Sequence, residues 1–263
     1  MNKQKIIKEL KLYSDTPELD VHFFLQDYPE PTQEQIDNFL LRRQKGEPVA
    51  KILGHCGFWD LDFLVSKDTL DPRPDSETMI EAVLDAVPNR QENLNILDVG
   101  TGCGCLLLTL LSLYPNAYGV GIDKSVNALK IANQNAIRLQ MKNVSFQKRD
   151  FMRPNWIHSL GMYDVIVSNP PYIPSWEIQK LNQSVKGFDP LLALDGGMDG
   201  LDAYRALAGS VSSLLSSNGR VFFEIGQGQE NAVQEIMKQF GFKLLKQYKD
   251  LGKITRILMF QRN

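Results

Sequence analysis

Cysteines, long apolar runs and an excess of one charge are all scarce in this sequence. Its three cysteines, Cys56, Cys103 and Cys105, are odd in number and two are nearly adjacent, which argues against a disulfide framework and favours a reducing compartment. No run approaches the ~20 apolar residues of a membrane span, and the Lys-rich N-terminus lacks a signal peptide's apolar core. The net charge of −2 lacks the basic excess of non-specific nucleic-acid binders. We therefore expect a cytoplasmic protein that binds neither membranes nor nucleic acid directly.

Histidine is scarce as well, and its placement excludes the commonest catalytic arrangements. His22, His55 and His158 are scattered and have no recognisable partners, so we interpret them as surface or packing residues. No His or Cys stands at metal-ligand spacing from Cys103 and Cys105, so no metal site is expected. Any chemistry must therefore come from other residue types.

The chain of 263 residues is long enough for one large and one small domain. Residues 1–53 predict short helices, the first over 3–13, a second with Pro17 at its first position, and a third that begins with a capping box of Thr32 and Gln35. Residues 54–75 contain GHCGFWDLDFLV, which favours a β-hairpin, and a linker that two prolines stiffen. Ser76 is then placed to cap a helix, and residues 76–263 form the larger domain.

From Leu94 onward, short apolar runs alternate with helix-like segments. The runs are LNILDV, AYGVGID, VSFQKR, YDVIVS and RVFFEIG. This alternation is typical of a doubly wound α/β fold, a mostly parallel sheet covered by helices on both faces. The tail predicts two strands joined by a tight turn, so we expect an antiparallel edge strand.

A glycine-rich turn, DVGTGCG, ends the first of these strands at residues 98–104. Glycines there let the backbone approach a ligand and present amides at a helix N-terminus. Asp123 ends the next strand about 20 residues on, where an acid binds ribose hydroxyls. Asp150 and Phe151, after the third strand, either border an adenine ring or form a helix cap with a core aromatic. Together these features predict a nucleotide-type ligand.

The segment NPPY, residues 169–172, follows the fourth strand at the same sheet edge. Pro170 and Pro171 make a rigid stretch whose carbonyls are available to a donor, and Asn169 adds an amide oxygen. Two fixed acceptors can hold both hydrogens of a planar NH₂ group, and the ring of Tyr172 can lie against it. This arrangement suits methyl transfer to an amide or exocyclic amine, which needs orientation and charge stabilisation rather than a strong base.

D-x-G-T-G-C-G followed by NPPY resembles the class I S-adenosylmethionine-dependent methyltransferases that modify planar nitrogens. GEPVAKILG with GFW, PRPDSE, NPPYIP, DPLLALDGGMDGLDAY and FFEIGQGQ resemble, more specifically, the release factor glutamine methyltransferase family, known as PrmC or HemK. The matching segments run from about residue 46 to 230.

This resemblance implies methylation of the glutamine side-chain amide in the GGQ motif of peptide chain release factors, with S-adenosylmethionine as donor and S-adenosylhomocysteine as product. It implies a seven-stranded class I sheet and a helical domain that docks the protein substrate. Separately, the sequence contains no heptads or other strong dimer signal, so we expect a monomer. The implied cofactor positions are Gly100, Thr101, Gly102, Cys103 and Gly104 for the methionine part, Asp123 for the ribose, Asp150 and Phe151 for adenine, and Asn169 at the boundary with the substrate. The implied substrate positions are Asn169, Pro170, Pro171 and Tyr172, of which Asn169, Pro170 and Tyr172 are catalytic, while Arg73, Ser76 and Glu77 help to close the pocket.

Two positions depart from the family pattern. Asp71 replaces the usual apolar residue before PRP, which raises a question about local packing, and Phe151 replaces the Trp of some relatives while keeping an aromatic face. Three alternatives stay open: a glutamine methyltransferase of a ribosomal protein, an amino-methyltransferase of a nucleic-acid base, which must flip that base, and a non-catalytic binder of S-adenosylmethionine.

Overall fold

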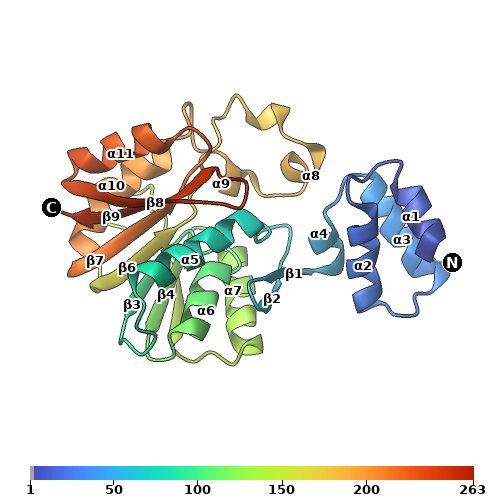
Figure 1. Cartoon of the computed structure of the whole chain (residues 1–263), viewed down its shortest axis with the longest axis horizontal. Coiled ribbons are helices and arrows are strands. Elements are labelled where there is room, and N and C mark those ends of the chain that lie inside the picture. Colours follow the sequence, from blue (N-terminus) through green and yellow to red (C-terminus); the bar gives the residue numbers. More distant parts are fainter. Residues whose placement is uncertain (1–2) are drawn as a thin grey trace.

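The computed structural model describes residues 3–263, and its N-terminal part is a group of short helices set apart from the sheet (Figure 1). These helices are α1 (Lys3–Leu10), α2 (Pro17–Asp27), α3 (Gln33–Gln44) and α4 (Val49–Leu53). The predicted capping box is confirmed, because the Thr32 side chain accepts from the Gln35 amide and the Gln35 side chain accepts from the Thr32 amide. Apolar side chains close a small core of their own, in which the rings of Phe24 and Phe39 stack at 4.3 Å.

A hairpin joins the helices to the larger part of the molecule. It consists of β1 (His55–Phe58) and β2 (Leu61–Leu64), which pair antiparallel as the sequence predicts. A 3-10 turn, η1 (Pro74–Ser76), then leads into α5 (Glu77–Ala86). The predicted capping role of Ser76 is wrong: its side chain makes no cap hydrogen bond and donates instead to Glu224 at 2.6 Å.

Within residues 3–263, the large sheet has seven strands in the order β5-β4-β3-β6-β7-β9-β8. The strands are β3 (Asn95–Val99), β4 (Tyr118–Asp123), β5 (Val144–Lys148), β6 (Tyr163–Ser168), β7 (Leu215–Glu224), β8 (Phe242–Lys249) and β9 (Thr255–Arg262). β3 to β7 run parallel, and β9 pairs antiparallel with both β7 and β8. The predicted fold class is therefore confirmed, and the antiparallel strand β9 lies one place inside the edge strand β8.

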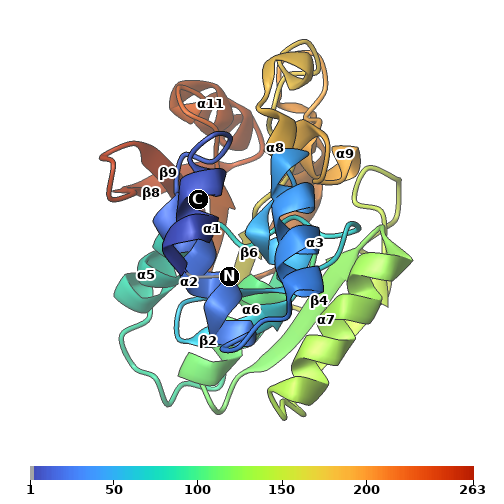
Figure 2. The ribbon, with the colours of Figure 1, turned by 90° about the vertical axis from the view of Figure 1, so that its right-hand side faces the viewer.

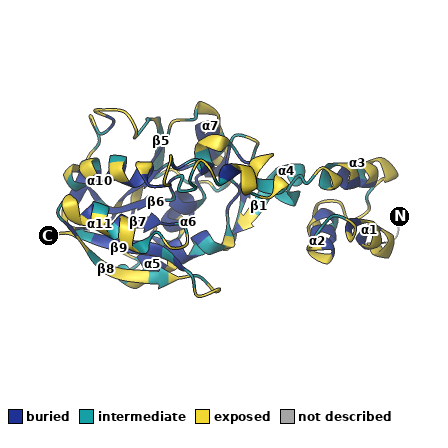
Figure 3. Cartoon of the chain, turned by 90° about the horizontal axis from the view of Figure 1, so that it is seen from above, coloured by how far each residue is buried: buried dark blue, intermediate teal, exposed yellow. Residues whose placement is uncertain are grey.

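Helices cover both faces of this sheet, and each face has its own apolar core (Figure 3). α5, α6 (Cys105–Leu113) and α7 (Val126–Arg138) pack on one face, and α10 (Asp202–Leu214) and α11 (Glu230–Gln239) pack on the other. The chain winds outward from β3 through β4 to β5 and then returns to β6 on the other side of β3. The carboxyl ends of β3 and β6 therefore form a topological switch point, where doubly wound sheets bind ligands.

The segment between β6 and α10 extends toward the N-terminal helices (Figure 2). It contains η2 (Ile178–Lys180), α8 (Gln183–Lys186) and α9 (Leu191–Leu194). α8 comes close to the end of α3, since a Cβ added at Gly46 would lie 3.5 Å from Gln183 Cγ. Among the helices of residues 3–263, each is too short or too polar to cross a bilayer.

Candidate functional site

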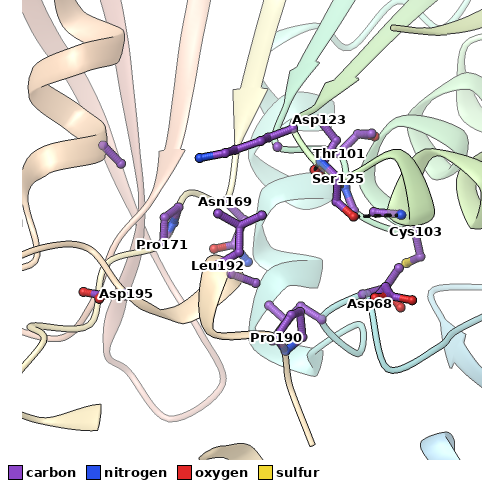
Figure 4. A pocket seen from close by; sticks show the side chains of 18 of the residues that line it. Asp68, Thr101, Cys103, Asp123, Ser125, Asn169, Pro171, Pro190, Leu192 and Asp195 are labelled. Carbon is purple, nitrogen blue, oxygen red and sulfur yellow. Dashed lines mark hydrogen bonds between the residues drawn. The ribbon is translucent and has the colours of Figure 1, made fainter. Parts of the chain in front are cut away.

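A pocket of about 760 Å³ opens at the carboxyl ends of β3, β4 and β6 (Figure 4). The linker before α5 and the segment around α9 complete its walls. Of the residues predicted from the sequence, the pocket brings together Gly100, Thr101, Gly102, Cys103, Asp123, Asp150, Phe151, Asn169 and Pro171, together with Arg73 and Ser76. Gly104, Pro170, Tyr172 and Glu77 lie outside its lining.

The glycine loop presents bare backbone to the pocket. Gly100 and Gly102 have φ of 79° and 55°, and a Cβ at either position would meet nothing within 4 Å. These two glycines are thus needed for the left-handed backbone, and their open side forms a cradle that a ligand can fill. Gly104 also has a positive φ, of 87°, but a Cβ there would lie 3.2 Å from Leu108 Cδ1, so this glycine allows close packing of α6 as well.

Asp98 anchors this loop from inside the protein. It is 1% exposed, and its Oδ2 accepts from the Thr101 hydroxyl at 2.6 Å. Burial raises the pKa of Asp98 to about 7, which the Thr101 hydroxyl partly offsets. The other oxygen, Oδ1, has no hydrogen bond of normal geometry in the described part of the chain. Asp98 belongs to the sequence motif at residues 98–104, but the spacing of that motif did not indicate its anchoring role.

Asp123 is positioned by backbone amides on both of its oxygens. The Gly102 amide donates to Oδ2 at 2.9 Å and the Ser125 amide donates to Oδ1 at 2.8 Å. Burial raises the pKa of Asp123, and these amides oppose that shift by stabilising the carboxylate. Each carboxylate oxygen has two acceptor positions, so Asp123 can still accept from a pair of neighbouring hydroxyls in the pocket.

Asp150 and Phe151 stand at the far end of the pocket, after β5. Asp150 accepts from the Met152 amide at 3.1 Å and pairs with Lys124 at 3.3 Å. Phe151 packs its half-buried ring against the core below α10 while it also lines the pocket. A polar group and an apolar face therefore occur together, as the binding of a flat heterocycle requires.

The NPPY segment divides between pocket and core. Asn169 and Pro171 line the pocket, whereas Pro170 is buried and Tyr172 packs against the core. The Asn169 Nδ2 donates to the Ser76 hydroxyl at 3.2 Å. Tyr172 is held by its backbone, since its carbonyl accepts from Gln229 Nε2 at 2.9 Å, and burial raises the pKa of its phenol. The Tyr172 side chain is therefore neutral.

Asp71 belongs to a buried group of charges at the pocket wall. Its carboxylate pairs with Lys51 of α4 at 2.7 Å, and Lys51 lies 3.5 Å from Asp189. Asp189 also accepts from Arg73 at 2.6 Å. Burial raises the pKa of Asp71, although Lys51 opposes the shift. Asp71 is therefore accommodated at this buried position by its ion pair with Lys51. Sequence spacing did not indicate this partner.

The interpretation of His55 as a residue without partners is wrong. Its Nε2 lies 2.7 Å from Asp27 of α2 and its Nδ1 lies 2.6 Å from Asp62 of β2. Burial lowers the pKa of His55, but Asp27 and Asp62 together outweigh it and the net shift is upward. Their separations of 28 and 7 residues left no sequence signal for the three to meet.

The doubly wound sheet and its switch-point pocket with a glycine loop define a class I methyltransferase. A family profile described as "Methyltransferase domain" matches residues 90–257. A solved methyltransferase from Pyrococcus furiosus is similar in fold, with a TM-score of 0.56 and 19% identity over 85% of this chain and 98% of that one. The ribosomal protein L11 methylase of Lactobacillus delbrueckii subsp. bulgaricus has a TM-score of 0.52 at 19% identity, covering 79% of this chain and 88% of its own.

Curated relatives identify the particular family. The release factor glutamine methyltransferase of Rhodospirillum rubrum is 44% identical over 89% of this chain and 70% of its own. That of Agrobacterium fabrum is 43% identical over 87% of this chain and 79% of its own. The chain belongs to the release factor glutamine methyltransferase family.

Proposed function

We propose that this protein transfers a methyl group from S-adenosylmethionine to the side-chain amide nitrogen of the glutamine in the GGQ motif of peptide chain release factors, leaving S-adenosylhomocysteine. The observation that carries this proposal is the position of Asn169, a side-chain amide in the same pocket as the glycine loop and Asp123. We place the reaction in the cytoplasm, where translation termination occurs, and in a monomer, because the sequence shows no heptads.

The pocket residues fit this cofactor. The open backbone of Gly100 and Gly102 suits the methionine part, the carboxylate of Asp123 suits the ribose hydroxyls, and Asp150 with Phe151 suits adenine. When bound, S-adenosylmethionine supplies an electrophilic methyl on a sulfonium.

The glutamine amide is a poor nucleophile, so its orientation decides the rate. We expect the Asn169 Oδ1 and the Pro170 carbonyl to accept the two amide hydrogens and to aim the nitrogen at the methyl group. Both acceptors also stabilise the positive charge that develops on nitrogen. The amide proton becomes acidic only as the methyl arrives, so no general base is needed before transfer.

The rim of the pocket suits a protein substrate. Leu191 and Leu192 line the pocket and are 59% and 49% exposed, and Trp176 on the same segment is 59% exposed. Apolar side chains that lie uncovered beside a pocket favour contact with another protein surface. The near-neutral charge of the chain fits such a partner better than it fits a nucleic acid.

Mass spectrometry tests the proposal. An unmethylated release factor is incubated with the protein and S-adenosylmethionine, with ribosomal proteins, RNA and DNA as parallel acceptors. One methyl on the GGQ glutamine is the expected result. Methyl transfer to another acceptor would contradict the substrate, and cofactor binding with no transfer to any acceptor would contradict the activity.

Asn169→Ala is the matching variant. It removes one of the two amide acceptors, so we expect the rate of transfer to fall ~10²-fold or more while calorimetry shows nearly unchanged cofactor affinity. Wild-type turnover in this variant would contradict the proposed amide contact.

A further inference from the structure

Three polar side chains meet at the wall of the pocket, and they come from three distant elements. Asn169 follows β6, Ser76 ends η1, and Glu224 ends β7. Ser168 is paired in register with Phe223, which sets Asn169 beside Glu224 at the ends of two neighbouring strands. Glu224 is 2% exposed and does not line the pocket. Its carboxylate is enclosed by protein, so it acts through its neighbours.

The hydrogen bonds among these residues have a direction. The Ser76 hydroxyl donates to Glu224 Oε2 at 2.6 Å, and the Asn169 Nδ2 donates to the Ser76 Oγ at 3.2 Å. A hydroxyl has one hydrogen. Because Ser76 donates that hydrogen to the carboxylate, its oxygen can only accept from Asn169. Asn169 must then direct its NH₂ toward Ser76, and its carbonyl oxygen is left for the pocket.

We propose that Glu224 is a positioning residue which, through Ser76, fixes the side-chain amide of Asn169 with its carbonyl oxygen available to the substrate amide. The inference rests on the proposed function, because only a substrate NH₂ group requires an acceptor at this point. The reversed amide would present a second NH₂ to the substrate and could not hold it.

Several charged and titratable groups surround Glu224. Arg256 of β9 and Asp75 of η1 act on it electrostatically, and the Asn169 amide also favours its charged form. Tyr204 of α10 donates to the Glu224 carbonyl at 2.7 Å, and burial raises the pKa of both Tyr204 and Tyr172, so both stay neutral. Burial raises the pKa of Glu224 to about 7, with Ser76 and Arg256 opposing the shift.

This pKa predicts how the network responds to pH. When Glu224 is protonated, its own hydroxyl can donate to Ser76, and the Ser76 hydrogen is then free to bond Asn169. The Ser76 hydroxyl then donates to the Asn169 oxygen. The Asn169 side-chain amide therefore flips, and its carbonyl oxygen no longer faces the pocket as an acceptor. The rate of methyl transfer should therefore fall as pH decreases through about 7.

Kinetics with a release factor give the first test. We expect Ser76→Ala to lower kcat ~10²-fold with little change in the Kd for S-adenosylmethionine, and Ser76→Thr, which keeps the hydroxyl, to recover most of that loss. Glu224→Gln should weaken the dependence of kcat/KM on pH around neutrality, because this residue no longer titrates while Asp98 still does. Ser168→Ala is the control. The buried Ser168 hydroxyl donates to the Val99 carbonyl and lies one residue before Asn169. Its removal should leave the wild-type pH profile unchanged. A wild-type kcat in Ser76→Ala, or a wild-type pH profile in Glu224→Gln, would overturn the proposal.

A second measurement does not depend on the substrate. In protein with ¹⁵N-labelled asparagine, the side-chain NH₂ signal of Asn169 is assigned by its loss in Asn169→Ala. We expect this signal to titrate near pH 7 in the full-length wild type and to be constant in Glu224→Gln. A titration without any transfer to a release factor would retain the positioning role and reject the proposed substrate. If the release factor is methylated but the Asn169 NH₂ signal shows the same pH dependence in wild type and Glu224→Gln, the positioning role is rejected and the proposed substrate is kept.

Discussion

At the residue scale, backbone amides hold Asp123 in place. The Gly102 and Ser125 amides fix both oxygens, so the carboxylate needs no side-chain partner and faces the pocket already oriented. Substitution by alanine removes the acceptor and leaves the strand intact. We expect Asp123→Ala to raise the Kd for S-adenosylmethionine about 10- to 100-fold, since hydrogen bonds to a charged group contribute about 1.5–3 kcal/mol. Calorimetry measures this, with Asn169→Ala as the control, and an unchanged Kd would contradict the ribose contact.

Glu224 also predicts how stability varies with pH. Its pKa is raised by burial to about 7, so the folded state holds a proton that the unfolded chain has released. The contribution of Glu224 to the free energy of unfolding is therefore fully present below about pH 4.3, the pKa of a glutamate in the unfolded chain. This contribution is lost as pH rises through about 7. Glu224→Gln does not titrate, so its free energy of unfolding should rise relative to wild type between about pH 5 and pH 8, by up to about 3 kcal/mol.

Urea unfolding at both pH values measures this difference. Glu81→Gln, at an exposed position of α5, controls for the loss of one carboxylate. A Glu224→Gln effect of equal size at both pH values would show that the carboxyl is ionised throughout this range.

At the scale of elements, one buried lysine joins three segments. Lys51 of α4 pairs with Asp71 of the linker and lies near Asp189 beside α9, and its side chain is 4% exposed. It also donates to the carbonyls of Ser66 and Thr69. Removing one partner of a buried pair leaves an uncompensated charge. We therefore expect Lys51→Met, which leaves the buried Asp71 carboxylate without its partner while Asp189 keeps Arg73, to lower the free energy of unfolding by about 3–5 kcal/mol.

The exposed pair Lys246–Asp85 is the matched control. Both side chains are 51% exposed, so Lys246→Met should change stability by about 1 kcal/mol or less. Combining Lys51→Met with Asp71→Leu should recover part of the loss, because the carboxylate that lost its partner is removed as well. Equal losses in Lys51→Met and Lys246→Met would contradict the buried network.

At the scale of the whole molecule, His55 links the helical part to the hairpin. Its ring lies between Asp27 of α2 and Asp62 of β2, and only the protonated ring can donate to both. Burial opposes the charge, but the two carboxylates raise the pKa of His55 overall. The link therefore stabilises the folded state fully below about pH 6.5, the pKa of a histidine in the unfolded chain. This stabilisation is lost as pH rises through the higher pKa that His55 has in the folded state.

Hydrogen exchange compared at equal pH measures this link. We expect His55→Ala to speed exchange in α2 relative to wild type at about pH 6 and much less at about pH 9. His22→Ala, an exposed position of the same helix, is the control. The same acceleration at both pH values would contradict a role for the protonated ring.

The local features were predictable from the sequence. The Thr32 capping box, the hairpin and the glycine loop form where expected, because each depends on backbone preferences and hydrogen bonds over a few residues. The order of apolar runs also predicted the parallel sheet, since buried parallel strands need apolar residues on both faces. Asn169 could be placed beside the glycine loop for the same reason: parallel strands bring their carboxyl ends to one edge.

The sequence by itself thus determined which strands, turns and motifs this protein contains and which end of the sheet carries its pocket. Only the tertiary structure decided which buried polar groups pair. Ser76 donates to Glu224, 148 residues away, instead of capping its own helix, and His55 and Asp71 find charge partners on other elements. A buried charge or hydroxyl must be satisfied by whatever group the packing of distant elements places beside it. Local spacing carries no information about that neighbour.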